Sequence, residues 1–254
     1  MKKIILVLFL LILGLTAVEF FSPPPVHSPT LVSPSPSPAP VLTQFGDYRY
    51  AWVKLENLTN LKLLPNHDTQ ASSEDLAKTN HCQVLVNGNF YDENDRPLGW
   101  LVSQGQTLSK PIASSLFNGF LSLSTSLSTS KVESRISSSF PQGLVNLGLQ
   151  SGPLLILDSK PLLLKISNDQ PRRRVIVALN NQSELIFLVL VGADSLFSGP
   201  LLADTPKLVA ALGQAIGQNL IAALNLDGGS ASAFHTDTIH LSEYAYIGSF
   251  FCYN

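Results

Sequence analysis

The sequence predicts an α+β fold: a single domain built on a mixed, largely antiparallel sheet with two main helices. Short apolar runs of strand length recur along the chain, and Gly, Pro, Asn and Asp separate them. Only two stretches carry the start signals and apolar spacing of a helix. Each lies just before a buried strand, and the pattern does not support a closed parallel α/β sheet. Strands therefore dominate the prediction.

The predicted strands follow from alternating or continuous apolar runs. Residues 97–108 predict a hairpin that turns at Gln104-Gly105, and another turn is expected at Asp158-Ser159. The segments predicted as strands or strand pairs are 46–55, 84–86, 97–108, 120–134, 148–164, 172–192, 220–226 and 235–253.

The two predicted helices have different start signals. Ser72 or Ser73 can cap a helix over residues 74–80, whose first turn carries the acids that a helix dipole favours. Asp204 is expected to cap the second, with Pro206 in its first turn. Apolar residues at helical spacing continue that helix to about residue 216.

The chain divides into three regions. Residues 1–21 place two lysines before a long apolar run, which predicts a signal peptide or a membrane anchor. No clean small-x-small cleavage site follows, so both readings stay open. Residues 22–41 repeat Pro and Ser and predict an extended linker, with a docking ligand for Pro-binding domains as the alternative. Residues 42–254 form the domain, which the leading lysines place outside the cytoplasm.

Composition narrows the possible partners. Hydrophobic residues make up 45% of the chain and charged residues 13%, which excludes a disordered protein. A net charge of −2 gives no electrostatic basis for binding nucleic acid. The apolar N-terminus makes a membrane an expected partner. Cys82 and Cys252 can form a disulfide in an oxidising compartment or stay as a buried and a surface thiol.

Two polar, glycine-containing turns follow apolar strands. They are NGNFYD at 87–92 and NLDGGSAS at 225–232. A buried strand would hold Asn225 and Asp227 on a rigid base, and the glycines beyond them could turn backbone N–H groups toward an anion. The strand ends are therefore the predicted site.

These residues resemble the phosphodiester glycosidase family. NLDGGSAS matches the family's Asn-Leu-Asp-Gly-Gly-Ser signature, and NGNFYD matches its Asn-x-Gly-Phe-Phe element with Asn89 in place of Gly. Further matches are PLGWLVSQGQ at 97–106, QSGPLLILDSKP at 150–161 and RRRVIVAL at 172–179. In the last segment Arg173 corresponds to the family arginine and Arg174 stands where Thr is usual. Three consecutive arginines leave open which of Arg172, Arg173 and Arg174 faces the site.

The resemblance implies hydrolysis of a sugar that is joined through its anomeric carbon to a phosphodiester. The expected partner is therefore a glycan or sugar-phosphate substrate. Asp227 is then the general base on water or the stabiliser of an oxocarbenium-like centre, with Asn87 and Asn225 positioning hydroxyls. The residues expected to bind phosphate or substrate are Arg173, Gly228, Gly229, Ser230, Asn89 and Ser151. No metal is expected at His235, Asp237 and His240, because HTDT at 235–238 lies in a predicted hairpin turn. No cofactor is expected, and the sequence has no P-loop or dinucleotide fingerprint.

Two functions from different classes remain. The first is an extracytoplasmic hydrolase of glycosyl phosphodiester bonds in envelope or exopolysaccharide glycans. The alternative is a non-catalytic module that binds glycans or assists envelope assembly. Asp227, Arg173 and Ser230 around one open pocket would favour the enzyme, and Asp227 buried in a turn hydrogen bond would favour the binder. A serine hydrolase is less well supported, since no G-x-S-x-G motif is present.

Overall fold

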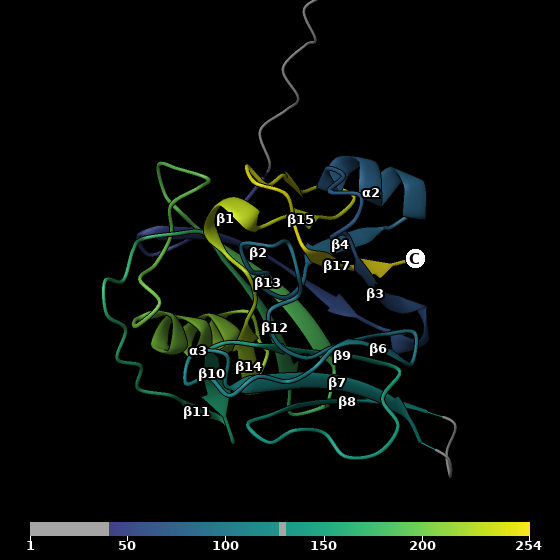
Figure 1. The fold of residues 1–254 in the computed structure, drawn as a ribbon. Helices are drawn as coiled ribbons and strands as arrows, with labels where there is room; N and C mark the ends of the chain where they lie inside the picture. Colours follow the sequence, from purple (N-terminus) through teal and green to yellow (C-terminus); the bar gives the residue numbers. More distant parts are fainter. Residues whose placement is uncertain (1–40, 127–130) are drawn as a thin grey trace, which may run out of the picture. The chain divides into compact units, whose positions relative to one another are not determined.

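The structure, a computed structural model, describes residues 41–126 and 131–254 (Figure 1). Two predicted segments lie outside the described residues. They are the signal or anchor at 1–21 and the linker at 22–41, apart from the last residue of the linker. Within the described part, two α-helices accompany three antiparallel sheets. No helix in this part is long and apolar enough to cross a bilayer.

The largest sheet has seven strands, ordered β1-β2-β13-β12-β14-β10-β11. Its centre is the hairpin of β12 and β13, whose interiors are apolar and which are buried along nearly their full length. The strands are β1 (Thr43–Phe45), β2 (Tyr48–Leu55), β10 (Leu154–Leu157), β11 (Lys160–Pro161), β12 (Arg174–Asn180), β13 (Leu185–Gly192) and β14 (Leu220–Asn225).

Two five-stranded sheets complete the fold. The order of the second sheet is β16-β15-β4-β17-β3 and that of the third is β6-β5-β9-β7-β8. The second contains β3 (Leu61–Pro65), β4 (Val84–Asn87), β15 (Phe234–His235), β16 (His240–Leu241) and β17 (Ser249–Tyr253). The third contains β5 (Leu101–Ser103), β6 (Gln106–Ser109), β7 (Gly119–Thr125), β8 (Val132–Ser137) and β9 (Leu147–Ser151).

One core lies between the three sheets, and the helices cover outer faces. Val84 and Val86 of β4 face the shared core, whereas Leu85 between them packs on the side of α2 (Ser73–Asn80). Side chains along the strands of the large sheet also alternate between the shared core and the opposite face. On that opposite face they pack against α3 (Thr205–Ala215). This alternation is the period of two that a strand buried on both faces requires.

Both helices form where predicted, with one difference at a cap. The Ser72 hydroxyl accepts the Asp75 N–H at 3.2 Å and caps α2. Asp204 occupies the N-cap position of α3 but makes no side-chain capping bond. Two short 3-10 helices, η1 (Leu58–Asn60) and η2 (Gly229–Ala231), complete the elements of the described residues.

The α+β prediction with two main helices is confirmed, and the sheet prediction is corrected. The described strands form three sheets rather than one mixed sheet, and every strand pairing among them is antiparallel. Short turns at Gln104-Gly105 and Asp158-Ser159, both with positive φ, account for two of the hairpins as expected. Other pairs, such as β4 with β17, join segments far apart in sequence, which a local pattern cannot reveal.

Cys82 and Cys252 form a disulfide, so the paired reading of the two cysteines is the correct one. Their Cα atoms lie 5.2 Å apart. Cys252 belongs to β17, and Cys82 lies between α2 and β4. The bond therefore joins the segment leading into the first polar turn to the last strand of the chain.

Candidate active site

The two polar turns predicted from the sequence lie against each other. The Asn87 side-chain amide donates to the Asp227 carbonyl at 2.8 Å, and the Asp227 N–H donates to the Gly88 carbonyl at 3.2 Å. Asn87 Oδ1 also accepts the Ala233 N–H at 3.0 Å. The ends of β4 and β14, in different sheets, are thus tied together by the asparagine that was expected to position hydroxyls.

Asp227 stands at this junction. Its Oδ1 accepts the Gly228 N–H at 2.8 Å, and its Oδ2 makes no hydrogen bond within the described residues. Although the residue as a whole is partly exposed, desolvation of the carboxyl raises its pKa to about 8, and the Gly228 bond only partly opposes this. At neutral pH most of the Asp227 carboxyl groups therefore carry a proton. Asp227 also raises the pKa of the Tyr91 hydroxyl, second to burial.

Arg173 lies behind the signature loop and is 1% exposed. Its Nε donates to the Ser232 hydroxyl at 2.7 Å, and its Nη2 donates to the carbonyls of Ser232 and Ser242, each at 2.8 Å. Its Cζ lies 5.3 Å from the centroid of the Phe197 ring. Burial lowers the guanidinium pKa to about 10, with Glu243 opposing, so the group stays charged at neutral pH. Arg173 thus holds the signature loop to the segment around Ser242.

The two signature glycines are packed against the start of β12. A Cβ on Gly228 would lie 2.8 Å from the Arg173 carbonyl oxygen, and Gly229 has a φ of +66°, which favours glycine. The Gly228 N–H donates to Asp227, and the Gly229 N–H donates to the Arg173 carbonyl at 2.9 Å. An anion at these amides would have to replace both bonds, so their phosphate role stays a prediction.

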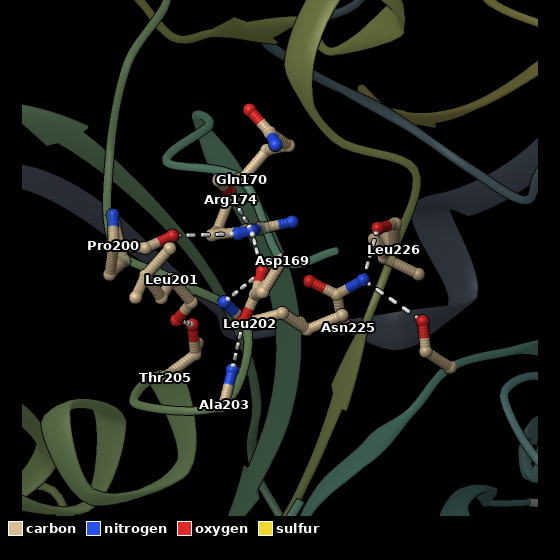
Figure 2. Close-up of polar contacts among 11 residues, drawn as sticks. Asp169, Gln170, Arg174, Pro200, Leu201, Leu202, Ala203, Thr205, Asn225 and Leu226 are labelled. Carbon is tan, nitrogen blue, oxygen red and sulfur yellow. Dashed lines mark hydrogen bonds and ion pairs between the residues drawn. The ribbon is translucent and has the colours of Figure 1, made fainter. Parts of the chain in front are cut away.

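Asn225 and Ser151 are buried beneath the loop. The Asn225 amide donates to the Leu226 carbonyl at 2.8 Å, as Figure 2 shows, and to the Gly152 carbonyl at 2.9 Å. Its Oδ1 is buried without a hydrogen-bond partner in the described structure. The Ser151 hydroxyl donates to the Asn225 carbonyl at 2.7 Å. These contacts brace the end of β14, and a direct contact of either side chain with substrate stays a prediction.

Arg174, the third arginine of the run, belongs to a separate polar cluster, also drawn in Figure 2. Its guanidinium donates to the Pro200 carbonyl at 3.0 Å and the Gln170 carbonyl at 2.7 Å, and lies 3.4 Å from Asp169. Asp169 also accepts the N–H groups of Leu202 and Ala203. Arg174 and Asp169 therefore organise the loop that leads into α3.

Asn89 and Ser230 differ sharply in exposure. Asn89 is buried, and its N–H donates to the Ser249 hydroxyl at 3.1 Å, which in turn donates to Asn89 Oδ1. Ser230 is exposed, and its carbonyl accepts the N–H groups of Tyr244 at 2.7 Å and Ala245 at 2.8 Å. Of the two, only the serine presents its side chain to solvent.

Arg172 is one of the three arginines that the sequence leaves open for the site, and it is not among the residues expected to bind phosphate. It is exposed, and its side chain runs along the Cα of Gly229. The run of three arginines has no internal feature in the sequence that tells its members apart. The structure separates them, because Arg173 and Arg174 are buried against hydrogen-bond partners that Arg172 lacks in the described part of the chain, those of Arg173 lying 59 and 69 positions away.

Direct contacts join several of the predicted site residues. Asn87, Asp227 and Gly228 are joined to one another, and Arg173 is joined to Gly229. That these residues line a substrate cavity stays a prediction. Across residues 41–126 and 131–254, no group of three His, Cys, Asp or Glu side chains is placed to hold a metal ion. His235 instead lies 2.7 Å from the Ser73 hydroxyl, and burial lowers its pKa to about 4.

The fold and the signature loop define a family of glycosidase-type hydrolases. The chain belongs to the phosphodiester glycosidase family, whose pattern matches residues 80–247. The resemblance predicted from the motifs is thus confirmed.

Solved structures share this fold at low sequence identity. The catalytic domain of zebrafish N-acetylglucosamine-1-phosphodiester alpha-N-acetylglucosaminidase, auto-inhibited by its pro-peptide, superposes with a TM-score of 0.56 at 15% identity, covering 85% of this chain and 86% of that one. A Synechocystis protein gives 0.59 at 15% identity, covering 83% of this chain and 60% of the other. A Burkholderia pseudomallei protein described as exported gives 0.53 at 10% identity, covering 81% and 73%. No curated protein matches the sequence.

Proposed function

We propose that the domain is an extracytoplasmic hydrolase that cleaves glycosyl phosphodiester bonds in envelope or exopolysaccharide glycans. Membership of the phosphodiester glycosidase family supports the reaction class. The observation that carries the proposal is Asp227, a carboxyl with a pKa raised to about 8 where the two polar turns meet. A perturbed carboxyl of this kind is typical of an acid–base residue.

In the proposed reaction the bond between the anomeric carbon and the phosphate oxygen breaks, and the electron pair leaves with the phosphate. Asp227 donates its proton to that oxygen, and a water oxygen bonds to the anomeric carbon. The resulting carboxylate takes the proton that the water loses, which regenerates the acid. The products are the free sugar and a phosphomonoester. Because phosphate is a good leaving group, one carboxyl can serve where ordinary glycoside cleavage uses two.

The protonated state of Asp227 changes the role expected from the sequence. A general base must begin as the carboxylate, and at neutral pH that form is the minority. We therefore assign Asp227 the acid step first and the base step second. Tyr91 lies near enough for the charge of Asp227 to contribute to the raised pKa of its hydroxyl.

Three features support a location outside the cytoplasm. Lysines precede an apolar run at the N-terminus. The Cys82–Cys252 disulfide suits an oxidising compartment. A protein of the same fold from Burkholderia pseudomallei is described as exported. Membrane attachment through residues 1–21 is part of this proposal.

One observation favours the alternative of a glycan-binding module. Asp227 does accept the N–H of the adjacent Gly228, as a residue that only stabilises a turn would. An aspartate that only stabilises a turn does not require a desolvated carboxyl with an unbonded second oxygen. Because Asp227 has both features, the hydrolase is preferred.

The test is the release of free sugar from a panel of sugar-1-phosphodiesters by the full-length protein. Asp227→Asn should lower turnover about 100-fold or more, since it removes the single acid–base group. Asp237→Asn, an exposed aspartate in the β15–β16 turn, is the matched control and should behave as the parent. If the parent cleaves no member of the panel but binds glycans, and Asp227→Asn binds equally well, the binding module replaces the hydrolase.

A further inference from the structure

The three consecutive arginines have different environments. Arg173 and Arg174 are buried, and their guanidinium groups donate to carbonyls, a hydroxyl and the Asp169 carboxylate. Arg172 is exposed and makes no hydrogen bond or ion pair within the described residues. It is therefore the one cation of the run whose donors are all available to a ligand.

The backbone places Arg172 beside the signature loop. On one side the Arg173 N–H donates to the Phe197 carbonyl at 3.1 Å, and on the other the Arg173 carbonyl accepts the Gly229 N–H. The chain is thus held between these two segments, and the Arg172 side chain follows the loop. A Cβ on Gly229 would lie 3.1 Å from Arg172 Cδ and 3.5 Å from its Nη1. Gly229 therefore allows both the positive φ and the close approach of the arginine.

The loop needs a cation if it is to hold a phosphodiester. Each phosphodiester group carries a negative charge, and the Gly228 and Gly229 N–H groups already donate within the chain. Arg173 has two of its three nitrogens occupied and is 1% exposed, so it would have to break contacts that hold the loop. An exposed guanidinium can instead form two parallel hydrogen bonds to phosphate without any such loss.

We propose that Arg172 binds the phosphate of the substrate, and that Arg173 is a positioning residue that holds the signature loop. The inference rests on the proposed function and assigns its phosphate-binding side chain. Arg172 has no charge partner to lose, so its replacement should affect binding without affecting folding.

The test compares Arg172→Ala and Arg172→Lys with Arg135→Ala in the full-length protein. Arg135 is an exposed arginine on β8, in a different sheet, and serves as the matched control. For a sugar-1-phosphodiester that the parent cleaves, Arg172→Ala should raise KM about 10- to 100-fold, the loss expected for a charge-assisted hydrogen bond. Arg172→Lys should recover part of this, because it keeps the charge but not the planar pair of donors. Urea unfolding midpoints should be the same for all four proteins.

A second readout does not need turnover. Binding of inorganic phosphate at low salt, measured by calorimetry, should weaken in Arg172→Ala and not in Arg135→Ala. If the parent cleaves the diester and Arg172→Ala keeps both its KM and its phosphate affinity, the inference is wrong and the proposed function stands. If the parent cleaves no sugar-1-phosphodiester but phosphate binding depends on Arg172, the function fails and the anion site stands. Loss of phosphate binding in a folded Arg173→Lys protein, with Arg172→Ala unaffected, would return the role to Arg173.

Discussion

The two polar turns, 87–92 and 225–232, look alike in sequence but differ in what the fold does with them. In the first, Asn87 and Asn89 are buried and their side chains are bonded to other parts of the chain. In the second, Asp227 keeps an unbonded oxygen and Ser230 is exposed. A polar residue at a strand end is thus available for chemistry only if the surrounding chain leaves its atoms unbonded. The first turn braces the second.

The largest expected loss of stability follows from removing the disulfide next to the first turn. It tests whether this turn serves to hold the second turn in place. The disulfide closes a loop spanning 170 residues and fixes the segment before β4 to β17. Replacing Cys82 and Cys252 together by Ser should lower the free energy of unfolding by about 2–5 kcal/mol, as for other native disulfides. Urea denaturation of the parent and the double variant measures this. Turnover per folded molecule should change little. Unchanged stability, or a large fall in turnover per folded molecule, would contradict this view of the first turn.

A smaller effect is expected from Asn87→Ala. The Ala233 N–H and the Asp227 carbonyl lose their side-chain partner, which should cost about 1–3 kcal/mol of unfolding free energy. Asn94→Ala, an exposed asparagine in the loop that follows, should stay within about 0.5 kcal/mol of the parent. Denaturation curves of both variants decide this. The view that the first turn only supports the second is wrong if Asn87→Ala unfolds like the parent but has a turnover as low as that of Asp227→Asn.

The smallest effect concerns the second turn and depends on pH. The Asp227 pKa is raised to about 8, so the proton-donating form is present below that pH and is lost above it. If the acid step requires this proton, kcat/KM should be flat at neutral pH and fall about tenfold per pH unit well above 8. The residual activity of Asp227→Asn should not show this fall in kcat/KM above pH 8. A profile that rises through pH 8 would instead show that the carboxylate acts only as a base.

The sequence by itself determined the local elements and the family. Periodicity and turn residues located both helices, the hairpin turns at Gln104-Gly105 and Asp158-Ser159, and the strand β14 that leads into Asp227. These features depend on residues that are neighbours in the chain, so they are readable without a structure. The signature motif identified the phosphodiester glycosidase family for the same reason.

The tertiary structure alone decided which of the predicted site residues remain available. Arg173 donates to Ser232 and Ser242, which follow it by 59 and 69 positions, and Asn87 donates to Asp227, 140 positions away. Pairing in the three sheets brings these groups together, and burial there also raises the pKa of Asp227. Hydrogen-bond partners and desolvation depend on segments distant in the chain. A local pattern could therefore name the candidate residues but could not separate the exposed Arg172 from its two buried neighbours.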